Sequence, residues 1–201
     1  MNQKQIWDKI APEWHEFKIN PAEQTIKFLK KQTGKVLDLG SGSGRNLTKI
    51  KAGKMYLIDF SDKMINLAKK KAKTKKIQAE FHVSDMTKLP FEDNFFNSAI
   101  CICALHCIES KKDRKKVVQE LFRVLKPKSQ AKISVWDFNS KRFNQKKGKE
   151  KSIGWKDKGK RYYYFYTEDE IKKELKQIGF KIKKIHSGIE FPNISLIIEK
   201  P

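Results

Sequence analysis

The sequence has few cysteines and no long apolar segment. Three of its 201 residues are cysteines, and Cys101, Cys103 and Cys107 lie in one short segment whose spacing fits neither a disulfide framework nor a zinc ligand set. No apolar run approaches the ~20 residues that a membrane-spanning helix needs. The first ten residues lack the apolar stretch of a secretory signal. We therefore expect a cytoplasmic protein without a metal site or a membrane segment.

Acidic residues are also scarce. The chain has 23 Asp and Glu against 45 Lys and Arg, which gives a formal net charge of +22. Such a charge either reflects a lysine-rich surface set by genome composition or attracts a polyanion such as nucleic acid. Hydrophobic residues make up 38% of the chain, which is enough for one core, and the length predicts a single domain over 1–201.

The periodicity of apolar residues predicts alternating strands and helices. Strands are expected at 35–40, 54–60, 77–83, 97–105, 130–138, 181–189 and 193–200. Helices are expected as two pieces within 6–29 and at 61–76, 113–127 and 167–180. This order predicts an α/β fold: a Rossmann-like, seven-stranded, mostly parallel sheet with one antiparallel strand near the C-terminus and helices on both faces.

Two segments stand outside this alternation. The N-terminal helices, within 1–32, are expected to cap a site at the sheet edge. The segment 138–166 is a basic and aromatic insertion, with ten Lys or Arg and two acids between Lys141 and Arg161. It is too long for a simple connection, and irregular segments of this length are usually functional or disordered.

Three alternate glycines follow the first expected strand in VLDLGSGSGRN, residues 36–46. Glycine loops of this kind bind nucleotides, but a Walker-type phosphate loop is excluded because Gly44 is followed by Arg45 and Asn46. A dinucleotide loop reads GxGxxG, and here the third glycine comes one position early, with Arg45 in its place. A dinucleotide is therefore the less favoured ligand.

Asp38, two residues before the first glycine, completes a loop pattern that resembles the S-adenosylmethionine-dependent methyltransferases of the Rossmann-like class. The resemblance implies that the glycines keep Cβ atoms away from the cofactor and that Asp38 lies near its methionine end. Asp59 ends the second strand, where a carboxylate can bind both ribose hydroxyls or, alternatively, act as an N-terminal helix charge beside Ser61. Asp85 and Met86 open the segment DMTKLPFEDNFF, which resembles the adenine-binding region of the same class. The expected cofactor-binding residues are Asp38, Gly40, Ser41, Gly42, Gly44, Arg45, Asn46, Asp59, Phe60, Asp85, Met86 and Ala104.

Further segments resemble the tRNA wobble-uridine methyltransferases that esterify a 5-carboxymethyl group. The resemblance covers nearly the whole chain and includes IWDKIAPEW, Val135-Trp136, RYYYFYTEDEI and HSGIEFPNISLIIEK. The chain departs from that family at LHC, residues 105–107, which keeps one of two histidines, and at Lys18, where the family has arginine. The family resemblance implies tRNA as the substrate.

A carboxylate acceptor is ionised at neutral pH because its pKa is about 4, so methyl transfer to it needs no general base. It does need a cationic or hydrogen-bonding holder, since burial of an unpaired carboxylate is costly. We expect this role for Lys18, His106, Arg161 and Tyr162. A satisfied core histidine is the alternative for His106, and Trp136 is expected in the core rather than in the pocket.

The basic insertion predicts contacts with RNA phosphates and unpaired bases. The expected nucleic-acid-binding residues are Lys141, Arg142, Lys146, Lys147, Lys149, Lys151, Trp155, Lys156, Lys158 and Lys160. The resemblance also implies a small zinc-binding activator subunit on the edge strand at 77–83. Two other functions remain open: a small-molecule methyltransferase acting on a quinone precursor or another metabolite, and a cofactor- or RNA-binding module without catalysis.

Overall fold

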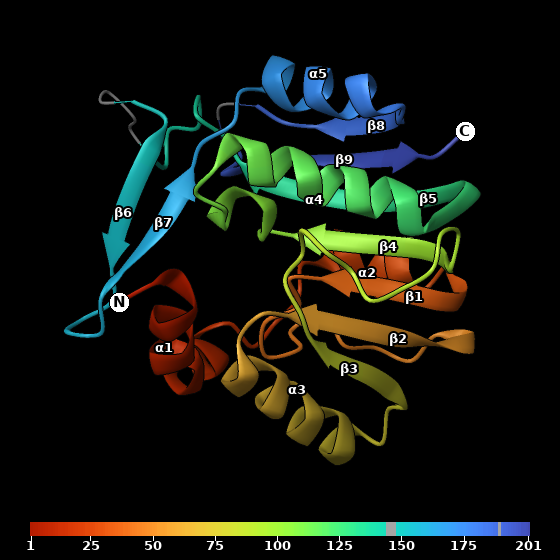
Figure 1. Ribbon diagram of the computed structural model, residues 1–201, viewed down its shortest axis with the longest axis horizontal. Helices are drawn as coiled ribbons and strands as arrows, with labels where there is room; N and C mark the ends of the chain where they lie inside the picture. Colours follow the sequence, from red (N-terminus) through yellow and green to blue (C-terminus); the bar gives the residue numbers. More distant parts are fainter. Residues whose placement is uncertain (144–147, 189) are drawn as a thin grey trace.

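The computed structural model describes residues 1–143, 148–188 and 190–201 and centres on one large sheet (Figure 1). Its strands run in the order β3-β2-β1-β4-β5-β9-β8. Their bounds are β1 Thr33–Leu39, β2 Lys51–Asp59, β3 Ala79–Val83, β4 Phe96–Ile102, β5 Leu125–Trp136, β8 Lys181–His186 and β9 Asn193–Glu199. The pairs among β1 to β5 are parallel, and β9 runs antiparallel to both β5 and β8. The expected sheet is confirmed.

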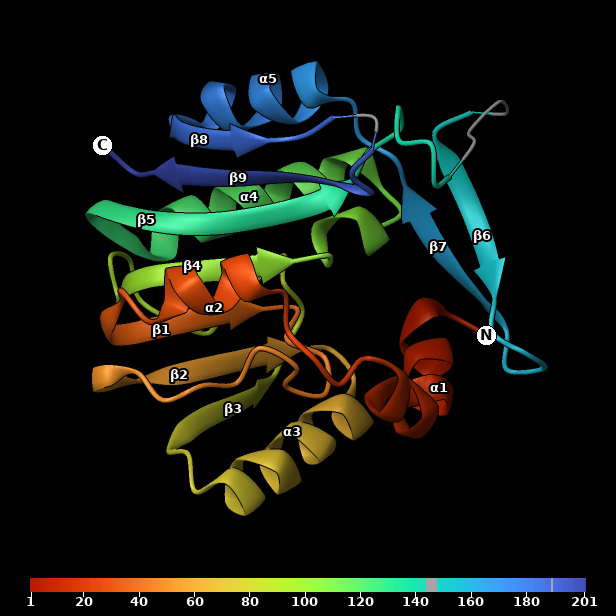
Figure 2. The same cartoon turned by 180° about the vertical axis from the view of Figure 1, so that it is seen from behind.

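Helices pack on both faces of this sheet, as Figures 1 and 2 show from opposite sides. The helices α2 and α3 lie on one face, and α4 and α5 lie on the other. Their bounds are α2 Glu23–Leu29, α3 Asp62–Lys75, α4 Lys111–Val124 and α5 Glu168–Ile178. Successive strand residues point to opposite faces, so Val36 packs on the α2 and α3 side and Leu37 on the other.

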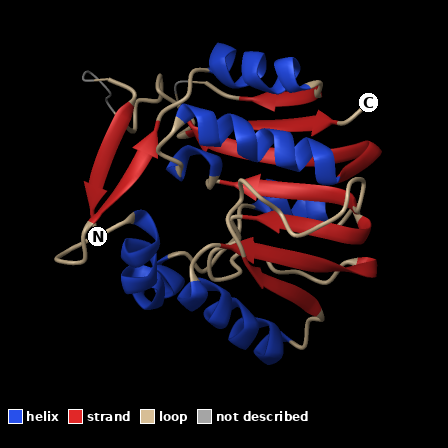
Figure 3. Ribbon diagram, viewed as in Figure 1, coloured by secondary structure: helices blue, strands red, loops and turns tan. Residues whose placement is uncertain are grey.

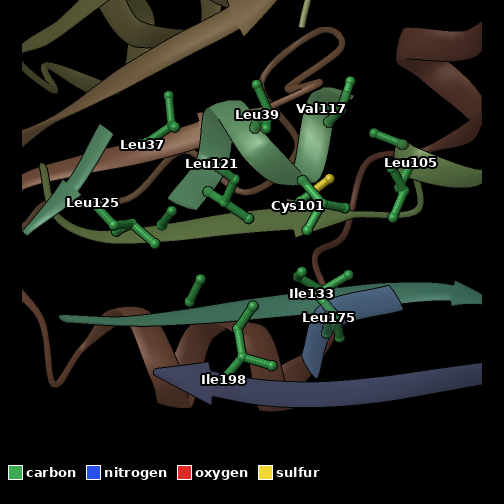
Figure 4. Packing of buried hydrophobic residues seen from close by; sticks show 14 of the residues in the cluster. Leu37, Leu39, Cys101, Leu105, Val117, Leu121, Leu125, Ile133, Leu175 and Ile198 are labelled. Atoms are coloured by element: carbon green, nitrogen blue, oxygen red, sulfur yellow. The ribbon is translucent and has the colours of Figure 1, made fainter. Parts of the chain in front are cut away.

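The larger core lies between the sheet and the helices α4 and α5. Figure 4 shows Leu37 and Cys101 of the sheet facing Val117 and Leu121 of α4. All four side chains are at most 2% exposed. The α4 and α5 side therefore anchors the strands whose carboxyl ends carry the glycine loop and its neighbours.

The helix α4 ends earlier than the sequence pattern predicts. It was expected to reach Pro127 but ends at Val124, and Leu125 already pairs with Phe96 as the first residue of β5. A residue that precedes proline is disfavoured in the helical region, so Lys126 takes the extended conformation that a strand needs. The end of the expected strand at 97–105 is a single helical turn, η1 (Leu105–Cys107).

The basic insertion contains an antiparallel hairpin, where an irregular segment was expected. β6 (Glu150–Gly154) pairs with β7 (Lys160–Tyr164). Three consecutive tyrosines, at 162–164, favour a strand. The many lysines before them made the whole segment appear polar and irregular, so the strand was not predicted. Two of the expected RNA-binding residues, Lys146 and Lys147, lie outside the described residues.

The helix α1 (Gln3–Phe17) lies near the carboxyl ends of the parallel strands, beside the hairpin (Figure 3). It begins at a capping box formed by Asn2 and Gln5 and packs against α3 and β7. The loops that follow the carboxyl ends of the parallel strands lie on the side of the sheet that faces α1 and the hairpin. No helix in the described ranges is long and apolar enough to cross a bilayer.

Candidate active site

A cavity of about 1140 Å³ lies at the carboxyl ends of the parallel strands. Its walls come from the loops after β1, β2, β3 and β4, from α1, and from the β6–β7 hairpin. Ligands of parallel α/β sheets bind at this edge. Most of the expected cofactor-binding residues line the cavity: Gly40, Ser41, Gly42, Arg45, Asn46, Asp59, Phe60, Asp85, Met86 and Ala104.

Two glycines shape the loop after β1. Gly40 and Gly42 have positive φ angles of 71° and 53°. A Cβ atom at Gly40 would overlap that of Ala104 at the end of β4, so this close approach requires glycine. A Cβ atom at Gly42 would have only the sulfur of Met64 nearby, 4.0 Å away. Because Gly42 lines the cavity, its missing side chain leaves room for a ligand beside the main chain.

Asp59 supports the glycine loop from the end of β2. Its Oδ2 accepts a hydrogen bond from the Gly42 N–H at 2.9 Å, and its Oδ1 accepts one from the Ser61 N–H at 3.0 Å. Burial raises the pKa of Asp59 to about 6, against the effect of these hydrogen bonds. Of the two expected roles, the structure shows the support of the start of α3. The ribose-binding role stays a prediction, and the lone pairs that remain on Asp59 can accept a hydrogen bond from a hydroxyl group in the cavity.

Asp38 and Gly44 were expected to bind the cofactor, but they do not line the cavity. Asp38 is fully buried, and neither of its carboxylate oxygens has a hydrogen-bond partner in the described part of the chain. Burial raises its pKa to about 7, with Arg45 acting in the opposite direction. Gly44 packs against Ala68 of α3, where a Cβ atom would come within 3.1 Å. Gly44 therefore sets the close packing of the loop on α3, and Asp38 is a buried acid at the end of β1.

His106 lies in η1, buried, at the cavity wall. Its Nδ1 accepts a hydrogen bond from the backbone N–H of Trp136 at 3.0 Å, and its ring stacks on the Trp136 ring at 4.9 Å. Burial lowers the pKa of His106 to about 3. A neutral ring whose Nδ1 accepts carries its proton on Nε2, so His106 is a hydrogen-bond donor rather than a base. Trp136 also lines the cavity, where a core position was expected.

Arg161 brings a buried cation to the cavity wall. Arg161 is 5% exposed. Its guanidinium carbon lies 5.1 Å from the centre of the Trp14 ring, 4.9 Å from that of Trp155 and 5.3 Å from that of Tyr163. Its Nη2 donates to the carbonyl of Gly154 at 3.4 Å, and its Nε has no partner among the described residues. No carboxylate of the residues described forms an ion pair with it. The aromatic rings therefore stabilise a guanidinium that still has donors to offer.

Lys18 lines the same cavity just after α1. Burial lowers the pKa of Lys18, and the positive charges of Arg45, Arg142 and Arg161 act in the same direction. All three arginines also line the cavity. Their shared positive potential favours a negatively charged ligand on this side of the site.

Tyr162 was expected near the acceptor, but it points away from the cavity. Its hydroxyl oxygen accepts a hydrogen bond from the guanidinium of Arg114 in α4 at 3.4 Å. Arg161 and Tyr163 line the cavity instead, because alternate residues of β7 face the same side. The alternation would have identified Tyr163 if the segment had been recognised as a strand.

The sequence pattern also missed the aromatic wall that α1 contributes. Trp7, Trp14 and Phe17 line the cavity, and Trp14 packs edge-on against Trp155 with ring centroids 5.4 Å apart. Positions 7, 14 and 17 fall on one face of a helix, so helical spacing was the available signal.

The basic residues expected to bind RNA divide into two groups. Lys149 pairs with Glu170 at 2.6 Å, and Lys156 and Lys158 pair with Glu13, so these lysines contact acids of the chain itself. Lys141 likewise pairs with Glu190. The others reach the cavity or the surface: Arg142 and Trp155 line the cavity, and Lys151 and Lys160 are exposed.

A comparison with protein families matches residues 36–128 to the methyltransferase domain family. Among solved structures, an S-adenosylmethionine-dependent methyltransferase from Methanosarcina mazei superposes with a TM-score of 0.74 at 22% identity, covering 90% of this chain and 98% of that one. A methyltransferase of Haloferax volcanii, solved in complex with the Trm112 methyltransferase activator, superposes with a TM-score of 0.78 at 17% identity. The latter match covers all of this chain and 98% of the other.

The solved structures, at 22% and 17% identity, share the fold of this chain. The sheet order, the glycine loop and the methyltransferase domain match over residues 36–128 support a class I S-adenosylmethionine-dependent methyltransferase, with S-adenosylmethionine as its cofactor. Within the described residues, no group of three or more His, Cys, Asp or Glu side chains could hold a metal ion.

Curated relatives fall into more than one methyltransferase group. A tRNA (carboxymethyluridine(34)-5-O)-methyltransferase of Arabidopsis thaliana is 31% identical over 133 residues, 65% of this chain, and the mouse enzyme of that name, ALKBH8, is 28% identical over 159 residues, 76% of this chain. The ubiquinone/menaquinone biosynthesis C-methyltransferase UbiE of Vibrio cholerae is 31% identical over 100 residues, 46% of this chain. The matches span 31%, 23% and 37% of the lengths of these three relatives.

Proposed function

We propose that the chain methylates the carboxylate of a 5-carboxymethyl group on the wobble uridine of tRNA. The observation that carries this proposal is Arg161, a buried guanidinium at the cavity wall with no carboxylate partner in the described chain. A planar guanidinium is suited to a carboxylate because two parallel N–H groups can bind both oxygens. The rings of Trp14 and Trp155 around it present faces on which an unpaired base can stack.

We propose that S-adenosylmethionine binds in the same cavity. Its methionine part would lie beside Gly42, where no side chain fills the space, its ribose hydroxyls would bind Asp59, and its adenine would lie by Asp85 and Met86; all four residues line the cavity. The cofactor supplies a methyl group on a positively charged sulfur. The residues of the chain then bind and orient the acceptor and exclude water, which is the main requirement of an in-line displacement.

His106 is not a general base, which suits a carboxylate acceptor because that acceptor is already ionised. His106 has its Nδ1 occupied by the Trp136 N–H, and its pKa of about 3 leaves it neutral at physiological pH. Its remaining N–H can donate to a carboxylate oxygen. A carbon or hydroxyl acceptor, as in the alternative of a small-molecule methyltransferase, calls for a proton acceptor in the pocket. The net charge of +22 also favours a polyanionic substrate.

We propose further that an activator subunit pairs along β3. This strand is one of the two edge strands of the sheet, and its last residue, Val83, is 45% exposed. An open edge offers unpaired backbone groups to a second chain. The Haloferax volcanii methyltransferase of the same fold is bound to such an activator.

Methylation of total tRNA, with and without a Trm112-type activator, tests the function. Labelled S-adenosylmethionine and mass analysis of digested nucleosides should show a methyl ester on carboxymethyl uridine. Arg161→Met should raise the KM for tRNA at least tenfold, whereas Arg161→Lys should lose less because it keeps the charge. Methyl transfer to a metabolite extract, with tRNA unmodified under both conditions, would refute the proposal and favour the small-molecule alternative.

A further inference from the structure

One half of the sheet has no helix on one of its faces. Figure 2 shows α2 in front of β1 and β4, while no helix of the described chain lies in front of β5, β9 and β8. Their other face is covered, because Ile133 of β5 and Leu196 of β9 belong to the core against α4 and α5. We call the uncovered side the open sheet face.

The strand register shows which side chains share the open sheet face. Lys132 of β5 and Lys184 of β8 both lie opposite Ile197 of β9, so the three side chains form one row across the face. In the next row towards the cavity, Ser134 and His186 lie opposite Ser195. Polar residues thus occupy positions that a covering helix would require to be apolar.

The charge of this face is strongly positive. Lys181 lies opposite Glu199, and the ammonium of Lys183 reaches the same carboxylate at 3.5 Å. With Lys132 and Lys184 the face carries four lysines and one acid. Among the residues described, neither Lys132 nor Lys184 has a carboxylate partner.

Lys132 connects the open sheet face to the active-site cavity. It is only 6% exposed, and its ammonium donates to the Ser195 hydroxyl at 2.9 Å. Burial lowers the pKa of Lys132, and the charge of Lys184 acts in the same direction. Lys132, Ser134 and Ser195 all line the cavity that contains the glycine loop. A ligand on this face can therefore continue into the methyl-transfer site.

We propose that the open sheet face binds the sugar–phosphate backbone of the RNA whose acceptor nucleotide enters the cavity. The proposal rests on an RNA substrate, as argued under the proposed function, and adds the surface that holds it. Charge complementarity identifies the occupant: lysines and hydroxyl groups bind phosphate oxygens, and in the two rows described above every residue except Ile197 is polar. The row from Lys184 through Lys132 leads towards the cavity.

A matched pair of triple variants tests this surface. Lys181→Gln/Lys183→Gln/Lys184→Gln removes three exposed lysines from β8, and Lys69→Gln/Lys70→Gln/Lys73→Gln removes the same charge from exposed positions of α3. Affinity for total tRNA is measured at several salt concentrations, with S-adenosylmethionine affinity as the control for folding. The β8 variant should bind tRNA about tenfold more weakly, with a salt slope shallower by about 2 to 3, because each lost phosphate contact removes about one released counterion. The α3 variant should change the affinity less than threefold.

Equal losses in the two triple variants would show a general charge effect and overturn the docking surface while leaving the RNA substrate intact. If the wild-type chain, with its activator, shows no salt-dependent binding of tRNA, the proposed function fails and the docking surface fails with it. Lys132→Met and Lys132→Arg provide a second measurement. Lys132→Met should weaken tRNA binding at least threefold and Lys132→Arg should restore it, and unchanged binding in a folded Lys132→Met variant would contradict the proposal.

Discussion

The carboxylate of Glu13 in α1 accepts a hydrogen bond from the indole N–H of Trp155 at 2.7 Å, across 142 positions of the sequence. Lys156 and Lys158 pair with the same carboxylate at 3.2 and 2.5 Å. Their hydrogen bonds, led by that of Lys158, lower the pKa of Glu13 to about 2. Glu13 thereby joins α1 to the loop of the β6–β7 hairpin beside the cavity.

Replacement of Glu13 should loosen this wall of the site. Glu13→Ala should raise the KM for RNA several-fold and increase hydrogen exchange in the hairpin, with little change in Tm, because the contact lies at the surface. Glu16→Ala, an exposed acid on the same helix, is the control. Because the pKa of Glu13 is depressed, its contact should persist above pH 4.5 and be lost as the pH falls towards 2. Identical KM values for the two variants would contradict this role.

The glycine loop should not tolerate a methyl group at Gly40. Gly40→Ala places a Cβ atom against that of Ala104 at a backbone φ of 71°, so binding of S-adenosylmethionine should fall at least tenfold in calorimetry. Gly154→Ala has no neighbour within 4 Å at its Cβ position and should bind normally. Adding Ala104→Gly should recover only part of the affinity, since it removes the overlap but not the strained φ. Normal binding by Gly40→Ala would show that the loop moves freely.

Binding of S-adenosylmethionine should depend on pH through Asp59. Burial raises the pKa of this carboxyl to about 6, so it is protonated in part at pH 5 and ionised at pH 7.5. An ionised carboxylate accepts ribose hydroxyls better and attracts the cationic cofactor, so affinity should rise as the pH increases from 5 to 7.5. Asp59→Asn should bind more weakly and show a flatter profile. A wild-type profile that is flat over this range would rule out the titration of Asp59.

His106 should make the stability of the fold depend on pH. Its pKa is about 3 when folded and about 6.5 when unfolded, so between these values the unfolded chain binds the extra proton. The free energy of unfolding is therefore not reduced by His106 above pH 6.5, where the ring is neutral in both states. It decreases as the pH falls below 6.5, with a slope of up to about 1.4 kcal/mol per pH unit. Urea unfolding of wild type and His106→Gln from pH 4.5 to 8 isolates it, since Asp38 and Asp59 titrate in both proteins. Parallel curves would mean that His106 has the same pKa in the folded and unfolded chains, and would contradict this prediction.

The two neighbouring tyrosines of β7 should differ in their effect on the KM for RNA, because only Tyr163 lines the cavity. Tyr163→Ala removes a ring that stacks on Trp136 at 4.3 Å inside the cavity wall, so the KM for RNA should rise. Tyr162→Ala removes the hydroxyl bonded to Arg114, so Tm should fall by several degrees with a smaller effect on KM. The reverse pattern would contradict the orientation of the strand.

Local patterns carried the prediction of the sheet and of the cofactor loop. The alternation of apolar strands and amphipathic helices identified the seven strands of the sheet, because each strand must bury the side chains of at least one face. The spacing of Gly40, Gly42 and Gly44 identified a ligand loop because backbone conformation depends on nearby residues. The same local reasoning failed in the basic insertion, where the lysines that precede the three consecutive tyrosines made the segment look irregular.

The sequence by itself determined the class of fold, the methyl donor and the acids at the ends of β2 and β3, since all of these follow from short, contiguous patterns. Only the tertiary structure decided that Asp38 is buried away from the cavity lining, that Tyr163 rather than Tyr162 faces the cavity, and that Lys132 connects the cavity to the open sheet face. These outcomes depend on which face each strand presents and on contacts such as that of Glu13 with Trp155, between segments distant in the chain. Packing across the whole molecule sets them, and no short window of sequence contains that information.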